Sequence, residues 1–197
     1  TSGSTGGADS ISIVGNVSSS QIYGNVGNDQ ISLDNGLIAS SMYGGSGNDS
    51  VYVVNGASTA AMIDGNAGAD FLSVGDLADT SSLLGGADDD TIQVAGASTQ
   101  WYVDGGDGND SLSIAGLNEK TSVLGGSGND TITIVSVSKG YLEANVGADS
   151  IVVASGAISS SLLAGRGDDL ISISGGVTAD SIYGGSGNDS FNFTGSV

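Results

Sequence analysis

An aspartate returns about every twenty residues along the whole chain, and this period limits the possible folds more than any other feature. Successive aspartates are 20, 20, 21, 20, 20, 20, 19, 20 and 20 residues apart. They are Asp9, Asp29, Asp49, Asp70, Asp90, Asp110, Asp130, Asp149, Asp169 and Asp189. Such a period is typical of a solenoid in which each repeat forms one coil. We therefore expect one solenoid over residues 1–197, without an internal domain boundary, as a segment of a longer chain.

The residues on both sides of each aspartate predict the elements of a coil. After the aspartate, polar and apolar residues alternate, as in Thr131–Ile134, which is the pattern of a strand with one buried face. A second apolar series indicates a second strand before each turn: Ile22, Met42, Ile63, Leu83, Val103, Val123, Leu142, Leu162 and Ile182. Together these patterns predict an all-β parallel solenoid of about ten coils, roughly 4.8 Å apart.

A third apolar series is spaced by twenty residues without exception: Val17, Leu37, Ala57, Leu77, Ala97, Leu117, Val137, Ala157 and Val177. We therefore expect the one-residue changes in aspartate spacing to fall after this series and before the next aspartate. The parallel strands at the two ends of such a stack invite pairing with another chain. Neither end of the sequence has the features of a cap, so we also expect a continuing chain or self-association, end to end or laterally.

Charge narrows the choice of partner. The 22 acidic residues outnumber three basic ones, Lys120, Lys139 and Arg166, which gives a formal charge of −19. This balance argues against nucleic acid or an anionic membrane surface as a partner and calls for a cation. The chain has no cysteine and no histidine, so neither a thiolate site nor the commonest zinc ligand is available. No apolar run approaches the roughly 18 residues that membrane insertion needs.

In a stack of coils the aspartates form a ladder, and each pair of neighbouring charges repels by about 1 kcal/mol in water and by more at a lower dielectric. A hard cation bound by carboxylate and turn carbonyl oxygens removes this repulsion, and calcium suits such flexible oxygen sites better than magnesium. Ten aspartates leave nine gaps, and nine Ca²⁺ ions would nearly cancel the charge of −19. Turn propensity alone is the alternative, but it does not require aspartate in every repeat.

Four turns carry a family resemblance: GGSGNDSVY from Gly44, GGDGNDSLS from Gly105, GGSGNDTIT from Gly125 and GGSGNDSFN from Gly184. They resemble the calcium-binding nonapeptide GGxGxDxUx of RTX proteins, in which U is large and apolar. The resemblance implies a right-handed β-roll, calcium between stacked coils and type I secretion. We number the turn from its first residue, so that Gly44 is position one and Asp49 is position six.

The resemblance also implies which residues bind calcium. The ten position-six aspartates would bind through their side chains. The carbonyl ligands would come from Gly27, Gly45, Gly47, Gly68, Gly86, Gly106, Gly108, Gly126, Gly128, Gly147, Gly165, Gly167, Gly185 and Gly187. A coil holds one nonapeptide where the usual β-roll has two, so calcium should occupy one edge only. Asparagine replaces the second glycine at Asn25, Asn66 and Asn145, Asp88 replaces the third, and the first turn, residues 4–7, departs furthest.

These features favour a non-enzymatic calcium-binding segment of a secreted bacterial cell-surface protein, of the surface-layer or adhesin type, that folds outside the cell. One alternative is an ice-binding solenoid. Such a surface needs a regular row of threonine and asparagine, but position three of the turn is never threonine and holds residues such as Val26 and Ser46. Another is the calcium-binding tail of a secreted hydrolase. The carboxylates at Asp88–Asp90 and Asp168–Asp169 could suit a glycosidase, but the repeat already accounts for one of each group. Trp101 could be a core plug or a contact residue.

Overall fold

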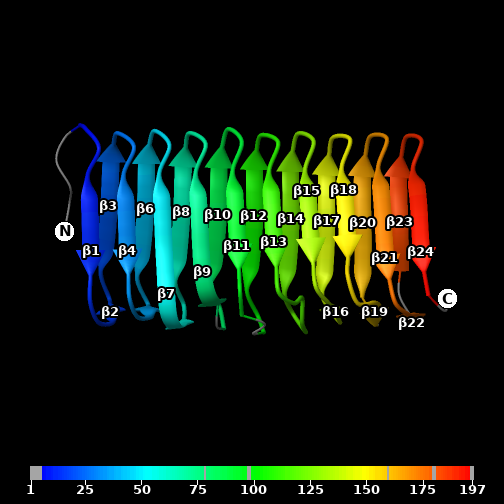
Figure 1. Ribbon diagram of the computed structural model, residues 1–197, viewed down its shortest axis with the longest axis horizontal. Helices are drawn as coiled ribbons and strands as arrows, with labels where there is room; N and C mark the ends of the chain where they lie inside the picture. Colours follow the sequence, from blue (N-terminus) through cyan, green and yellow to red (C-terminus); the bar gives the residue numbers. More distant parts are fainter. Residues whose placement is uncertain (1–5, 78, 97–98, 159, 179–180, 196–197) are drawn as a thin grey trace.

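Two parallel β-sheets lie face to face along the whole elongated molecule (Figure 1). The computed structural model describes residues 6–77, 79–96, 99–158, 160–178 and 181–195. The larger sheet has ten strands: β1 (Ser10–Ile13), β4 (Gln30–Leu33), β7 (Ser50–Ser58), β9 (Phe71–Leu77), β11 (Thr91–Val94), β13 (Ser111–Ile114), β15 (Thr131–Ile134), β18 (Ser150–Val153), β21 (Leu170–Ser174) and β24 (Ser190–Thr194). Its neighbouring strands come from successive repeats, so each repeat forms one coil.

The smaller sheet has nine strands: β3 (Gln21–Val26), β6 (Ser41–Ser46), β8 (Met62–Ala67), β10 (Ser82–Ala87), β12 (Tyr102–Asp107), β14 (Ser122–Ser127), β17 (Tyr141–Val146), β20 (Ser161–Arg166) and β23 (Ser181–Ser186). Short strands lie between the sheets in the chain: β2 (Val17–Ser18), β5 (Leu37–Ile38), β16 (Val137–Ser138), β19 (Ala157–Ile158) and β22 (Val177–Thr178). The predicted all-β parallel solenoid is therefore confirmed.

The core is one continuous stack of apolar side chains between the two sheets. Period-two alternation places the inner residues in register, so that Ile92 pairs with Leu72 on one side and with Leu112 on the other. The inner residues of the interior coils are buried, whereas Phe191, in β24 at one end of the stack, is 47% exposed. Trp101 is 2% exposed, which identifies it as a core plug rather than a contact residue.

One prediction about the coil length is wrong. The extra residue between Asp49 and Asp70 lies between Val53 and Ser58, because β7 contains a register shift and pairs Ser58, not Ala57, with Leu77. Ser58 is buried at the place in the coil where the third apolar series predicts Ala57, whose side chain lies outside the described residues. The missing residue between Asp130 and Asp149 follows Val137, as predicted, since Val137 is 20 residues after its partner Leu117 and Tyr141 only 19 after Ser122.

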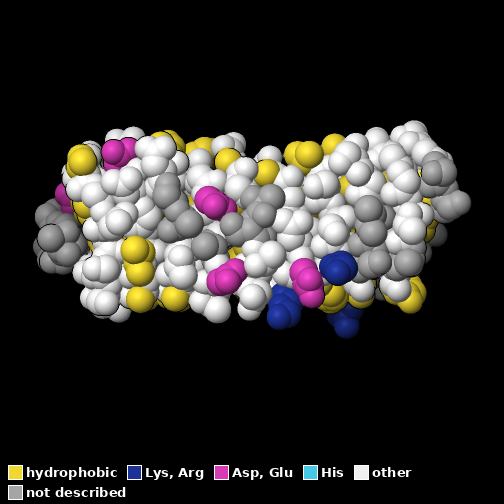
Figure 2. Space-filling view, turned by 90° about the horizontal axis from the view of Figure 1, so that it is seen from below, with side chains coloured by type: hydrophobic (Ala, Val, Ile, Leu, Met, Phe, Trp, Pro, Cys, Tyr) yellow, Lys and Arg dark blue, Asp and Glu magenta, His cyan; other side chains and the backbone are white. Residues whose placement is uncertain are grey.

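The two edges of the solenoid differ in chemistry. We call the side on which strands of the smaller sheet turn into strands of the larger one the aspartate edge; it lies at the top of Figure 1. The opposite edge, which faces the viewer in Figure 2, carries the two lysines, Lys120 and Lys139, and there Lys139 Nζ lies 3.9 Å from Glu119 Oε2. Among the described residues, no helix is long and apolar enough to cross a membrane.

Candidate metal centre

The position-six aspartates line up along the aspartate edge and are linked by a single kind of hydrogen bond. The backbone N–H of each aspartate donates to Oδ1 of the aspartate in the next coil, over distances from 2.6 to 3.2 Å. The donor in the first bond is Asp9 and the acceptor in the last is Asp189. The structure therefore brings all ten predicted aspartates together in one ladder.

The second carboxylate oxygen has no partner in most of the ladder. The aspartates from Asp29 to Asp169 are only 1–3% exposed. Their buried Oδ2 atoms without a hydrogen bond belong to Asp29, Asp49, Asp70, Asp90, Asp110, Asp130, Asp149 and Asp169. A buried carboxylate oxygen without a partner is costly, and such groups are rare in folded proteins. Eight such oxygens in consecutive coils indicate a bound ligand, to which each coil contributes one carboxylate oxygen.

Carbonyl oxygens of the turns also face the gaps between coils. A Cβ atom placed on Gly45 would lie 2.1 Å from the carbonyl oxygen of Asn25 in the preceding coil, and one on Gly47 would lie 2.4 Å from that of Gly27. All the glycines predicted as carbonyl ligands have φ between 106° and 150°, which only glycine adopts easily. Glycine at positions two and four therefore lets carbonyl oxygens of one coil approach the backbone of the next.

The degenerate turns keep the same backbone shape. Asn25, Asn66 and Asn145 occupy position two with φ of 85°, 76° and 76°, and Asp88 occupies position four with φ of 79°. Asparagine and aspartate tolerate this left-handed region better than other residues that have a side chain. In the first turn, residues 4 and 5 lie outside the described residues, and Asp9 is only half-buried.

The pKa values of the ladder carboxyl groups are raised more by burial than by repulsion between neighbouring charges. The carboxyl pKa values are raised from 3.8 to about 8 for Asp90, about 7 for Asp70 and Asp130, and about 6 for Asp110 and Asp149. Desolvation is the largest cause in each case, and charged neighbours raise the pKa further, while the backbone N–H donor lowers it. The sequence predicted the repulsion but not the larger cost of burial.

A second ladder at position five was missed in the sequence. Here the backbone N–H donates to the preceding coil, as from Asn48 to Asn28 Oδ1 at 2.9 Å and from Asn109 to Asp89 Oδ1 at 2.7 Å. Ala69 and Ala148 have no side-chain acceptor, so at this position they take part only as donors. Their backbone N–H groups donate to Oδ1 of an asparagine in the preceding coil. The recurrence of Asn and Asp at position five was the available signal, since their side-chain Oδ1 atoms can accept the backbone N–H of the next coil.

The donor set fits calcium. Each interior gap offers carboxylate and carbonyl oxygens and no nitrogen or sulfur ligand, the chemistry that a hard cation prefers. Among the residues that the structure describes, no three His, Asp or Glu side chains converge on one point. A calcium ion here would instead be held by one or two aspartates together with turn carbonyls. The individual ligands and the number of ions, up to nine, remain predictions.

Comparison with known proteins identifies the family. The model of the RTX calcium-binding nonapeptide repeat (4 copies) matches residues 5–36, 40–60, 62–80, 102–113, 122–133 and 160–191, more than half of the chain. The chain therefore belongs to the RTX calcium-binding repeat family. No curated protein and no solved structure matches it. The matched segments omit the turns of Asp90 and Asp149, yet the structure places both aspartates in the same ladder.

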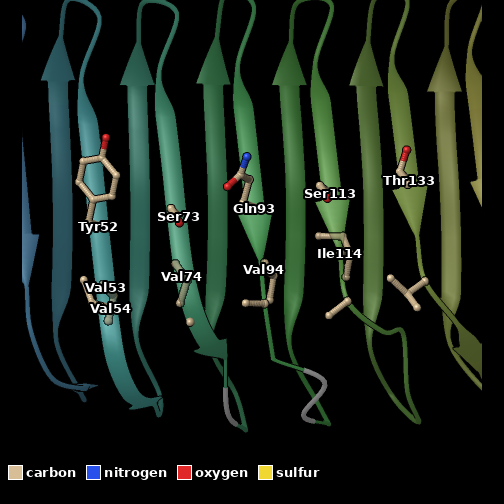
Figure 3. A pocket seen from close by; sticks show the side chains of 14 residues that line it. Tyr52, Val53, Val54, Ser73, Val74, Gln93, Val94, Ser113, Ile114 and Thr133 are labelled. Carbon is tan, nitrogen blue, oxygen red and sulfur yellow. The ribbon is translucent and has the colours of Figure 1, made fainter.

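A shallow hollow of about 650 Å³ lies away from the ladder, on the outer face of the larger sheet (Figure 3). Tyr52, Ser73, Gln93, Ser113 and Thr133 form a row across five neighbouring strands beside it. None of its lining residues is charged. The hollow is therefore separate from the candidate metal centre in both place and chemistry.

Proposed function

We propose that this chain is a calcium-dependent structural segment of a secreted bacterial cell-surface protein, of the surface-layer or adhesin type. The chain is unfolded without calcium and folds outside the cell, where calcium is abundant. The observation that carries this proposal is the series of buried carboxylate oxygens without a partner from Asp29 to Asp169. An ion that only the folded state binds stabilises that state by mass action, so the calcium concentration selects the state of the chain.

The proposed role is mechanical and does not involve catalysis. RTX repeats are generally structural, and RTX proteins are typically exported by type I secretion. A chain that stays unfolded at low calcium suits export, and a stack clamped between coils by calcium suits a rod on the cell surface. Association of such rods, end to end or laterally, is part of the proposal, and sedimentation in calcium at several protein concentrations measures it.

Circular dichroism and size-exclusion chromatography test the calcium dependence. In EGTA we expect an unfolded spectrum and a large hydrodynamic radius, and in excess calcium a β spectrum and a smaller radius, with magnesium less effective. Asp110→Asn should raise the calcium concentration needed for folding. Asp107→Asn is the matched control, because it removes the same charge from an exposed position three of the same turn. A β spectrum that EGTA leaves unchanged would overturn the proposal.

Immunolabelling tests the proposed location. Intact cells that produce the parent protein should bind an antibody raised against the calcium-loaded chain, and a calcium chelator should weaken the labelling. Labelling that appears only after the cells are permeabilised contradicts a surface role, while the calcium dependence of folding could still hold.

A further inference from the structure

Position one of the turn differs between two parts of the ladder. It is glycine in the described coils from Gly24 to Gly125 and again at Gly184, but alanine at Ala144 and Ala164. None of these glycines has a left-handed φ. The backbone conformation therefore accepts alanine at this position, and the reason for glycine must be space.

The space beside position one is occupied by two oxygens of the gap. A Cβ atom placed on Gly105 would lie 2.3 Å from Asp110 Oδ2 in its own coil and 2.3 Å from the carbonyl oxygen of Gly125 in the next. Across the glycines of the series, the distance to the carboxylate oxygen is 2.1–2.5 Å. These Oδ2 atoms, from Asp29 to Asp130, are among the buried oxygens without a partner. A methyl group at position one thus competes for space with the aspartate oxygen that is a candidate calcium ligand and with a carbonyl oxygen of the next coil.

In two coils that methyl group is present. Ala144 and Ala164 are 0% exposed and belong to the hydrophobic core. Their own aspartates, Asp149 and Asp169, remain in the ladder and keep the same hydrogen bonds to it. The gaps that follow these two alanines therefore keep the carboxylate but have less room and a more apolar wall than the others.

We propose that Ala144 and Ala164 divide the calcium ladder into two classes of site. The inference rests on the proposed calcium binding. The six gaps that follow Gly24, Gly44, Gly65, Gly85, Gly105 and Gly125 form the strong class. The gaps after the two alanines form the weak class, because calcium needs six to eight oxygens around it and the methyl group crowds the aspartate oxygen and a carbonyl oxygen beside it. The weak sites should bind calcium about tenfold to hundredfold less tightly, the effect expected of overpacking by one methyl group.

The same alanines make their coils less dependent on calcium. Alanine in place of glycine at a permitted φ restricts the unfolded chain and stabilises the folded one. Its buried methyl group adds to the core. The coils of Asp149 and Asp169 thus gain packing at the position where the other coils keep space for an ion.

Calcium titration of the full chain tests this division, with isothermal calorimetry for affinity and native mass spectrometry for the number of ions bound. The double change Ala144→Gly and Ala164→Gly should move two ions from the weak to the strong class and make the calcium-free chain less stable. Gly105→Ala should move one ion from the strong to the weak class and make the calcium-free chain more stable. Ala154→Gly, at an exposed alanine in the Asp149 coil, is the matched control and should leave the binding curve unchanged.

The outcomes separate the two proposals. If the unaltered chain binds no calcium, the proposed function fails. If it binds calcium in a single class that neither the double change nor Gly105→Ala alters, calcium binding stands and the division into two classes is wrong.

Discussion

At the aspartate edge every turn has the same length, whereas at the opposite edge the length differs in two of the coils. Three residues separate each strand of the smaller sheet from the next strand of the larger one, from Val26 and Gln30 to Ser186 and Ser190. On the opposite side the inner residues of the two sheets are usually nine positions apart, but ten from Val53 to Ile63 and eight from Ile134 to Leu142. Only the aspartate edge must align oxygens and N–H groups of neighbouring coils, so only that edge fixes its length.

The largest expected effect comes from inserting one glycine at each edge. An insertion between Gly108 and Asn109 displaces Asp110 from both of its hydrogen bonds, to Asp90 and to Asp130, and breaks the ladder. We expect the calcium-loaded chain to lose its cooperative thermal transition or to melt about 6–12 °C lower, the effect of roughly 3 kcal/mol in a chain of this size.

The matched insertion follows Ser136 at the opposite edge. Ile134 and Val137 are three positions apart there, whereas the corresponding Val153 and Ala157 are four apart, so the insertion copies a spacing that the next coil already has. It should cost less than about 1 kcal/mol, since loop length itself matters little. Similar losses from the two insertions would show that both edges are equally constrained.

The second prediction concerns pH in the absence of calcium. Between the unfolded carboxyl pKa of about 4 and the raised values near 6–8 of Asp70, Asp90, Asp110, Asp130 and Asp149, the folded chain holds more protons than the unfolded one. Stability therefore falls as the pH rises through this window. In EGTA we expect more β structure at about pH 5.5 than at pH 8, both above the sequence pI of about 4.1.

Calcium should reverse this dependence, because the ion favours the charged carboxylate. Asp90→Asn keeps an oxygen at the place of Oδ1 but cannot titrate, so it should raise the calcium-free stability at pH 8 more than at pH 5.5. Circular dichroism across the pH range in EGTA measures both effects. A calcium-free chain that is more folded at pH 8 than at pH 5.5 contradicts the assigned burial of the aspartates.

A smaller effect tests why glycine dominates position two. Gly126 has a φ of 116°, and a Cβ atom there would lie 1.9 Å from the carbonyl oxygen of Gly106. Gly126→Ala should destabilise the calcium-loaded chain by about 2–3 kcal/mol, the cost of a strained backbone together with a clash. Gly126→Asn should cost less, because Asn145 already occupies this position in the next coil with a φ of 76°. Urea unfolding in excess calcium compares the two variants, and equal losses would contradict the role of φ.

The sequence predicts the parts of this molecule that depend on local, repeated patterns. The inner strand residues, the two sheets and the row of aspartates follow from alternation and period, because one coil determines its neighbours. The two oxygens of each carboxylate from Asp29 to Asp169 have different roles: Oδ1 accepts a hydrogen bond from the neighbouring coil, and Oδ2 has no partner. This difference, and the depth to which the carboxylate is buried, depend on contacts between coils twenty residues apart. The register at Ser58 could not be predicted because the irregular edge accepts either Ala57 or Ser58 as its inner residue, and the spacing of twenty favoured Ala57.

The smallest predicted effect lies at that irregular edge. Ser58 is 0% exposed and its Oγ atom has no hydrogen-bond partner, whereas Ser81 is also buried but donates to the Ser58 carbonyl oxygen and accepts from the Ala61 N–H. A buried hydroxyl without a partner costs about 1–3 kcal/mol, and a satisfied one contributes about 1 kcal/mol. Ser58→Ala should therefore raise the free energy of unfolding by up to about 1 kcal/mol, and Ser81→Ala should lower it by a similar amount. Urea unfolding in calcium measures both changes, and a loss of stability in Ser58→Ala would mean that the Ser58 hydroxyl has a partner in solution, for which a buried water is the simplest candidate.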